Sequence, residues 1–332
     1  MTISRTASSL NSACAFFTSI QRLETSGSPT GTSSIVAQSN AMEWPMSVMS
    51  SGRCLTVALA VVLSASACAR TPPTDQKGNS RRSEATETGR TINGHTYTDA
   101  PVDVKLGPNT FRIPANYLDS QIAPWPGGGV SLILEWPDMR PTTPGARANP
   151  RTNDFRKEVA VSIDYIDSAP IETSLERLSS NEAVTEADSV ERGNPKDRLD
   201  LRVAQSETMG LTPYAIDEAK MAVYSGQYEA RYRKPHARNP GFEDVWYVAR
   251  GPAGNLTTFI KCDSTTFRED GLRLEGDQVI HKQGTVAAGC IHYFADVENK
   301  LSITLDYKRA FLKDWKRMED AVRDLLARTK AK

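Results

Sequence analysis

Two cysteines and a histidine near the end of the chain are the residues whose types could bind a metal or form a covalent link. Cys262 ends one predicted strand, Cys290 begins another, and His292 follows two residues later. Two strands joined by a loop are usually neighbours, which brings two sulfurs within bonding distance. Together with His292 they offer three metal ligands, whereas a structural zinc site takes four. We therefore expect a disulfide rather than a metal site, and it should stabilise the fold by roughly 3 kcal/mol.

The sequence holds no motif that is typical of hydrolysis. Its four histidines stand outside any H-E-x-x-H zinc spacing, and no G-x-S-x-G elbow presents a serine nucleophile. The glycines at 127–129 are followed by neither a Lys-Ser/Thr pair nor a predicted helix, so they lack what a phosphate-binding loop needs. No pair among the 40 acidic residues has a context that marks it for glycoside chemistry. We predict no catalytic residue, no metal and no cofactor, and expect a protein that is not an enzyme.

The stretch 224–238 is rich in tyrosine and arginine, which protein interfaces use more than other surfaces do. Taken as a strand, it places Tyr224, Tyr228 and Tyr232 on one face, while Arg231 and Arg233 point the other way. These residues are interface candidates, although we favour a row of core tyrosines beside a solvated basic edge. Trp125 lies in a Pro-Trp-Pro-Gly-Gly-Gly turn, and its exposure there would mark a loop that contacts a partner protein.

Short runs rich in β-branched and aromatic residues, separated by glycine and proline, predict strands from Ile92 onward. The expected strands are 102–106, 130–136, 159–165, 199–203, 221–232, 245–249, 256–262, 290–294 and 301–307. Most of them follow one another without a helix between them. This order is typical of a mostly antiparallel sheet.

Two segments have the apolar spacing of a helix, a short one over 171–178 and a long one over 311–326. The apolar stripe of the long segment comprises Phe311, Trp315, Met318, Val322 and Leu325. Such a stripe must be buried against other elements. The fold class is therefore α+β, with the long helix packed on the sheet. A weak internal echo between 162–165 and 304–307 leaves open two pseudo-repeated halves, although we favour coincidence for four residues.

The N-terminal part of the chain is predicted to carry an export signal. Arg53 precedes the apolar run 55–63, which is too short to span a bilayer, and small residues follow it up to Cys68. We expect a spurious or disordered extension over 1–45, a signal peptide over 46–67, a flexible tether over 68–91 and an α+β domain over 92–332. Met1, Met46 and Met49 remain alternative start sites.

The segment 64–68 resembles a bacterial lipobox, in which the cysteine is acylated before cleavage, although Ala65 stands where that family prefers an aliphatic residue. The resemblance implies lipidation of Cys68, and Ala69 after it implies delivery to the periplasmic side of the outer membrane. The alternative is cleavage after Ala67 by the ordinary signal peptidase, which leaves the domain free in the periplasm. Both routes lead to an oxidising compartment, where disulfides persist.

The charges of the chain are balanced, because Lys plus Arg and Asp plus Glu both number 40. The sequence therefore lacks the basic excess that draws a protein to a nucleic-acid backbone or an anionic bilayer. We expect no nucleic-acid partner, and contact with the membrane through the lipid anchor only.

A resemblance to a known family rests on short segments spread over the folded part. They are Phe-Arg-Ile-Pro at 111–114, Asn116-Tyr117, Trp-Pro-Asp-Met at 136–139, the Cys262 and Cys290 pair, and the closing helix with Trp315. These segments resemble those of small periplasmic lipoproteins encoded beside secreted toxins, notably the type VI secretion immunity lipoproteins that inhibit lipase effectors. The resemblance implies a protein that binds and blocks a toxin in the periplasm, without catalysis.

We therefore expect an exported protein-binding module, an immunity or inhibitor protein directed against a secreted toxin. One alternative is an envelope structural or assembly lipoprotein with a resident partner. Another is a hydrolase without a recognisable motif, which a deep polar pocket with convergent Asp, Glu or His would favour. A flat or convex surface with exposed tyrosine and arginine would favour the binding protein.

Overall fold

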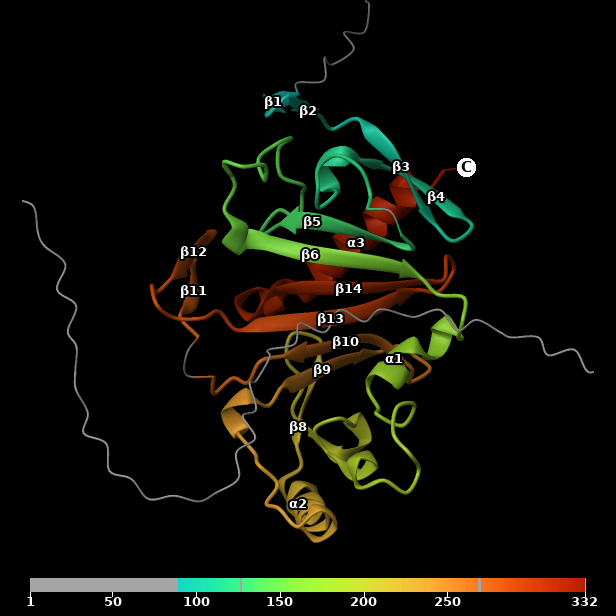
Figure 1. Cartoon of the computed structure of the whole chain (residues 1–332), viewed down its shortest axis with the longest axis vertical. Coiled ribbons are helices and arrows are strands. Elements are labelled where there is room, and N and C mark those ends of the chain that lie inside the picture. The colour runs from blue at the N-terminus through green and yellow to red at the C-terminus, as the bar shows by residue number, and fades with distance from the viewer. Residues whose placement is uncertain (1–88, 126, 268–269, 332) are drawn as a thin grey trace, which may run out of the picture. The chain divides into compact units, whose positions relative to one another are not determined.

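Eight antiparallel strands form one sheet, in the spatial order β5-β6-β14-β13-β10-β9-β8-β7 (Figure 1). In that order they are β5 Gly129–Glu135, β6 Glu158–Tyr165, β14 Leu301–Lys308, β13 Gly289–Asp296, β10 Leu256–Cys262, β9 Val245–Arg250, β8 Thr212–Ile216 and β7 Arg202–Ala204. Three two-stranded ribbons accompany the sheet: β1 Arg90–Ile92 with β2 His95–Tyr97, β3 Pro101–Leu106 with β4 Asn109–Pro114, and β11 Leu272–Glu275 with β12 Gln278–His281. The antiparallel α+β class expected from the sequence is confirmed.

The computed structural model describes residues 89–125, 127–267 and 270–331. The predicted extension over 1–45, the signal peptide over 46–67, Cys68 and almost all of the tether lie outside these residues. Arg90, at the end of the expected tether, already belongs to β1. Within the described part, no helix is long and apolar enough to span a membrane.

The long helix α3, Trp315–Thr329, covers one face of the sheet and follows a 3-10 turn at Arg309–Asp314 (Figure 1). The predicted burial of its apolar stripe is confirmed, because all five residues lie in the main core. The helix was expected to begin at 311, but Phe311 lies in the 3-10 turn and only the other four residues lie on α3. The strand face beneath alternates in the way a one-sided sheet requires: in β14, Leu301, Ile303 and Leu305 are fully buried. Helix and sheet therefore bury each other's apolar faces.

A second, smaller core lies on the opposite face of the same sheet. Trp246 and Val248 of β9 belong to it, whereas Tyr247 between them belongs to the main core. The short helix α1, Ser174–Leu178, contributes Leu175 to this second core. The strand β6 is followed by α1 on one face of the sheet, whereas its neighbour β14 is followed by α3 on the other face. The four-residue echo between β6 and β14 is therefore not accompanied by a structural repeat.

The predicted strand over 221–232 is wrong, because these residues belong to the helix α2, Glu218–Tyr232. The side chain of Asp217 caps its start by accepting from the backbone N–H groups of Ala219 and Lys220. Arg233 ends it in the left-handed conformation, with φ 56°. The tyrosine spacing of four residues keeps side chains on one side of a strand and also on one side of a helix, so it could not separate the two.

Several other strands were not predicted from the sequence, or were predicted with the wrong start. The expected strand 199–203 begins as a 3-10 turn, Leu199–Leu201, and only then continues as β7. The strand β8 was missed because Pro213 stands inside it, and proline argues against a strand in a sheet interior. The hairpin β11–β12 has a Gly276-Asp277 connection, which is a recognised hairpin signal that could have found it.

Candidate functional site

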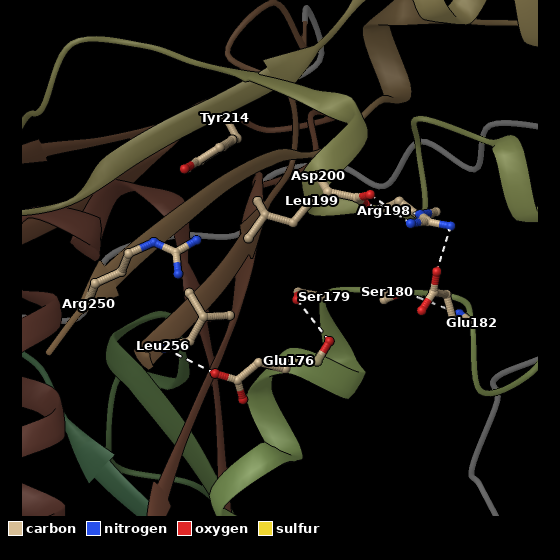
Figure 2. A pocket seen from close by; sticks show the side chains of 10 residues that line it. All are labelled: Glu176, Ser179, Ser180, Glu182, Arg198, Leu199, Asp200, Tyr214, Arg250 and Leu256. Atoms are coloured by element: carbon tan, nitrogen blue, oxygen red, sulfur yellow. Dashed lines mark hydrogen bonds and ion pairs between the residues drawn. The ribbon is translucent and has the colours of Figure 1, made fainter. Parts of the chain in front are cut away.

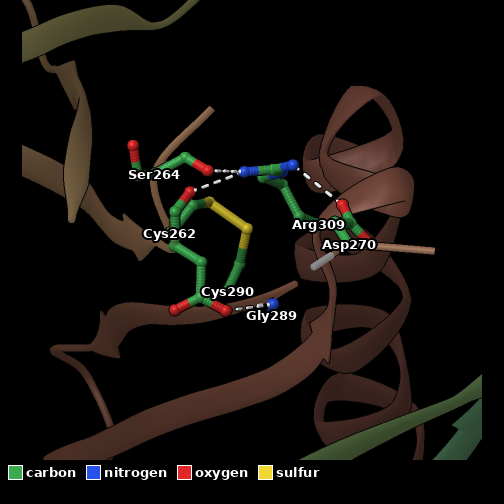
Figure 3. Close-up of a disulfide and its surroundings, with 7 residues drawn as sticks. Cys262, Ser264, Asp270, Gly289, Cys290 and Arg309 are labelled. Carbon is green, nitrogen blue, oxygen red and sulfur yellow. Dashed lines mark hydrogen bonds and ion pairs between the residues drawn. A yellow bond between two sulfur atoms is a disulfide. The ribbon is translucent and has the colours of Figure 1, made fainter. Parts of the chain in front are cut away.

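The disulfide expected between Cys262 and Cys290 is present (Figure 3). The two residues are directly opposite in the β10–β13 register, with their Cα atoms 4.0 Å apart, and both are buried. The register therefore explains the bond. Within the residues that the structure describes, no group of three His, Cys, Asp or Glu side chains could hold a metal ion.

The disulfide joins the two ends of the segment 263–289, which carries β11 and β12. Arg309 binds the same segment: its guanidinium donates to the backbone carbonyl of Asp263 at 2.9 Å and to the carboxylate of Asp270 at 2.8 Å. Asp270 in turn accepts from the backbone N–H groups of Leu272 and Ala288. The segment 263–289 is thus held by the disulfide and by a charged hydrogen-bond network. These cysteines therefore have a structural role.

His292 faces α3 rather than the cysteines' surroundings, and it belongs to a buried charged group. Its Nε2 lies 3.5 Å from Oε2 of Glu319, an oxygen that also accepts from the hydroxyl of Thr258 at 2.9 Å. Arg323 donates to the other oxygen of Glu319 at 2.7 and 3.0 Å. Burial lowers the pKa of His292 despite the neighbouring carboxylate, so the ring is neutral at pH 7. His292 is therefore a core residue, with no path to a substrate.

A cleft of about 390 Å³ opens on the side of α1, between that helix, the turn at Leu199–Leu201 and the strands β8–β10 (Figure 2). Three of its charged groups are engaged with one another, because Arg198 lies between Asp200 at 2.6 Å and Glu182 at 2.9 Å. Glu176 accepts from the backbone N–H of Leu256, and Arg250 donates to the backbone carbonyl of Gly254. One serine of the wall, Ser179, donates its hydroxyl to the backbone carbonyl of Glu176. No histidine lines the cleft, so Ser179 has no imidazole there to take its proton. The carboxylates that line the cleft are those of Glu176, Glu182 and Asp200.

The tyrosine and arginine candidates lie on α2 and just beyond it, at the β7–β8 end of the sheet (Figure 1). Tyr224 is buried, Tyr228 is half-buried and Tyr232 is exposed, and adjacent ring centroids in this row lie 6.1 and 4.7 Å apart. Arg231 and Arg233 are both exposed. Burial raises the pKa of Tyr224 to about 12, so its hydroxyl is neutral at any physiological pH. The exposure of the tyrosines therefore increases from Tyr224 to Tyr232, and Tyr232 is the one that is fully available to a partner.

Trp125 is 67% exposed, as an interaction loop would require. It precedes β5, which is the strand at the opposite end of the sheet from β7 and β8. The structure therefore brings the tyrosines and Arg231 together on one helix but leaves Trp125 far from them.

An apolar groove beside α2 was not foreseen from the sequence. It has a volume of about 390 Å³ and lies between α2, the 3-10 turn Val190–Gly193 and Leu201. Its lining residues, which define the α2 groove below, are Gly193, Leu201, Ala219, Lys220, Val223, Tyr224 and Gln227. The strand interpretation hid this groove, because in a strand Val223 and Tyr224 point to opposite faces, whereas in a helix both line the groove.

Comparison with known proteins gives one informative match. No family model matches the sequence, and no curated protein matches it. A solved structure does match: Smlt3025, an immunity protein of the Stenotrophomonas maltophilia type IV secretion system. The identity is 72%, the TM-score is 0.72, and the match covers 75% of this chain and 100% of that protein. The secretion system named there is type IV, whereas the sequence resemblance named type VI. With this identity over the full length of Smlt3025, the chain belongs to a family of secretion-system immunity proteins.

Proposed function

We propose that this chain protects the cell that makes it by binding a secreted toxin in the periplasm and blocking it. The observation that carries the proposal is the 72% identity with Smlt3025 over the whole of that protein. At such identity the two folds and most of their surfaces are shared, so a common mode of action is expected. The toxin itself is delivered by a type IV secretion system, as the relative's description suggests for its own system.

The periplasmic location is part of the same proposal. Cys68, in its lipobox-like segment, receives the lipid and holds the folded domain at the periplasmic side of the outer membrane. The disulfide between Cys262 and Cys290 supports export, because such bonds form and persist in oxidising compartments. A toxin that enters the periplasm would then meet its inhibitor there.

Inhibition by binding requires no chemistry from this chain. In the cleft beside α1, Arg198 is paired with both Asp200 and Glu182, and the buried His292 cannot reach a substrate. A binding protein needs only an exposed surface that fits the toxin.

Contact killing between sibling cells tests the function even while the toxin is unidentified. A strain that lacks this gene should be killed by its wild-type parent on a solid surface, and a plasmid copy of the full chain should restore survival. An attacker without a functional type IV system should not kill, whereas one without a type VI system should. Equal survival of the deletion strain and the wild type would overturn the function. Killing that depends on the type VI system would overturn the choice of secretion system.

The lipid anchor makes a separate prediction. In fractionated cells the wild-type chain should sediment with the outer membrane, and Cys68→Ala should move it to the soluble periplasmic fraction, because nothing else in the proposal attaches it to lipid. Ala67→Ser, which keeps the cysteine and a small residue at the cut site, is the matched control. Outer-membrane sedimentation of Cys68→Ala would refute the anchor.

A further inference from the structure

The helix α2 buries unusually little of its surface. Of its 15 residues only Met221 and Tyr224 are buried. It lies beyond β8, at one end of the sheet, and packs against the short turn Val190–Gly193 rather than against a broad apolar layer (Figure 1). Helices in proteins gain most of their stability by packing an apolar face. Much of this helix is therefore free to gain contacts from another molecule.

The α2 groove is apolar where such contacts would form. Its volume of about 390 Å³ lies in the lower part of the roughly 300–1,000 Å³ range of binding pockets. Leu201 and Ala219 form part of its wall, and Val223 is 62% exposed beside them. An apolar side chain inserted here would be removed from water together with Val223, which is how anchor residues stabilise interfaces.

Positive charge remains available along the groove. Lys220, Gln227 and Arg231 fall on one face of α2, since their spacings of seven and four residues correspond to about two turns and one turn. Lys220 donates to the backbone carbonyl of Asp200, and its nearest carboxylate oxygen, on Asp217, is 3.9 Å away. Arg231 makes no ion pair with any residue that the structure describes.

Three of the neighbouring carboxylates have other partners. Glu218 binds Arg238 at 2.5 Å, and Asp200 binds Arg198 at 2.6 Å. Glu191 accepts from the hydroxyl of Tyr232, a contact that lowers the pKa of that carboxyl and keeps it charged and occupied. The groove thus has an apolar wall with two cations beside it, Lys220 in a long 3.9 Å pair with Asp217 and Arg231 without an ion pair among the described residues. This arrangement is complementary to an apolar side chain with acidic neighbours.

We propose that the α2 groove is the surface that receives the toxin, and that its occupant is an apolar side chain within an acidic segment of that protein. This assignment rests on the proposed function. The apolar side chain lies against Val223 and Leu201, and flanking carboxylates bind Lys220 and Arg231. Tyr232, held by Glu191, extends the contact beyond the groove.

The other exposed features fit a partner less well. In the cleft beside α1, Arg198 is already bound by both Asp200 and Glu182. Trp125 is a single exposed ring at the far end of the sheet, with no groove lined by it among those described. The α2 groove combines an apolar wall with the exposed Val223, and Arg231 beside it makes no ion pair with a described residue.

The test uses the full chain and the secreted protein that kills the deletion strain. Val223→Arg should weaken their association at least tenfold, because it fills the groove with a charged side chain that repels Lys220 and Arg231. Val297→Arg is the matched control, since Val297 is also half-exposed but lies in the turn between β13 and β14. Both positions face solvent, so both variants should unfold at the wild-type temperature, which circular dichroism verifies.

A charge reversal tests the acidic character of the partner. Lys220→Glu combined with Arg231→Glu should abolish toxin capture and protection. The control combines Lys105→Glu with Lys313→Glu, since Lys105 is exposed on β3 and Lys313 is exposed in the turn before α3. The control should leave capture and protection unchanged. Association of the wild-type pair should also slow as salt is raised. Unchanged toxin binding by both the Val223→Arg and the charge-reversed variants would overturn the groove assignment and leave the proposed function intact.

A photo-crosslinking residue in place of Val223 identifies the occupant directly in living cells. A crosslink to the toxin, mapped to an acidic segment, is the expected result. A crosslink to a second copy of this chain, or to its own residues 1–88, would overturn the assignment. If the wild-type chain captures no toxin at all, the proposed function fails and this inference fails with it.

Discussion

At the scale of single residues, His292 is a buried titratable group whose protonation should affect the fold. It is fully buried, and the groups that face it are Glu319 and Arg323 of α3, with the rings of Tyr307 and Trp315 each 6.1 Å away. Burial alone would raise the pKa of Glu319, but its contacts with His292 and Arg323 more than offset this and lower the pKa to about 2. The folded protein thus holds an ionised carboxylate beside a neutral imidazole at neutral pH.

Acidification should therefore destabilise the fold through His292. Its pKa is lowered in the folded state, whereas the unfolded chain binds a proton near pH 6.5. The stability associated with the neutral ring is present above pH 6.5 and is lost as the pH falls towards the folded pKa, by up to about 1.4 kcal/mol per pH unit. Urea unfolding at pH 7.5 and pH 5.5 should show this loss in the wild type and a smaller one in His292→Leu. His95→Leu, at an exposed position, should keep the wild-type loss, and equal losses in all three would contradict the role of His292.

The disulfide makes a second prediction at this scale. Removing it by Cys262→Ala, Cys290→Ala or both should lower the free energy of unfolding by about 3 kcal/mol, because the bond closes a loop with a sequence separation of 28 residues. The two single variants and the double variant should lie close together, since each lacks the same bond. Reductant should destabilise the wild type and leave the double variant unchanged. A wild-type protein that is insensitive to reductant would refute the contribution of the bond.

At the scale of elements, the helices α2 and α3 have the same length but should contribute differently to the free energy of unfolding. Val322 on α3 is fully buried, whereas Val223 on α2 is 62% exposed. Val322→Ala should cost about 2 kcal/mol, from lost burial plus the cavity that remains, and Val223→Ala should change stability by less than about 0.5 kcal/mol. Thermal or urea unfolding of this matched pair measures the contrast. Equal costs would mean that α2 is anchored more firmly than its burial indicates.

The same two helices show what could be predicted from the sequence. The stripe from Phe311 to Leu325 has mixed spacings of three and four residues, which only a helix places on one face, so its pattern was decisive. The tyrosines of α2 are spaced only by four residues and fit either structure. The candidates Tyr232 and Arg231 were identified by residue type, but the groove was not, because Leu201 and Gly193 reach it from turns distant in sequence. Sequence spacing carries no information about such contacts until the topology is known.

At the scale of the whole molecule, the binding surface that we propose is separated from the parts that hold the fold together. The disulfide and the hydrogen bonds of Arg309 lie near the centre of the sheet, and α3 covers its main core face. The helix α2, in contrast, lies beyond β8 at one end of the sheet. Substitutions on α2 can therefore alter toxin recognition with little effect on stability. We expect natural relatives that meet different toxins to differ on α2 and the turns beside it more than on α3, which aligned sequences of toxin and immunity pairs would check.

The pairing of the last described residues with β4 has a consequence for the order of events during synthesis. Ala331 donates its backbone N–H to the carbonyl of Thr110, and Lys330 forms a bridge with Phe111, just after α3 has covered the main core. Every strand precedes α3 in the chain, so a nascent polypeptide shows a bare apolar sheet face until that helix has been made. The apolar face of the sheet is therefore covered only after α3 has been made, and the contacts of residues 330 and 331 then join the end of α3 to β4.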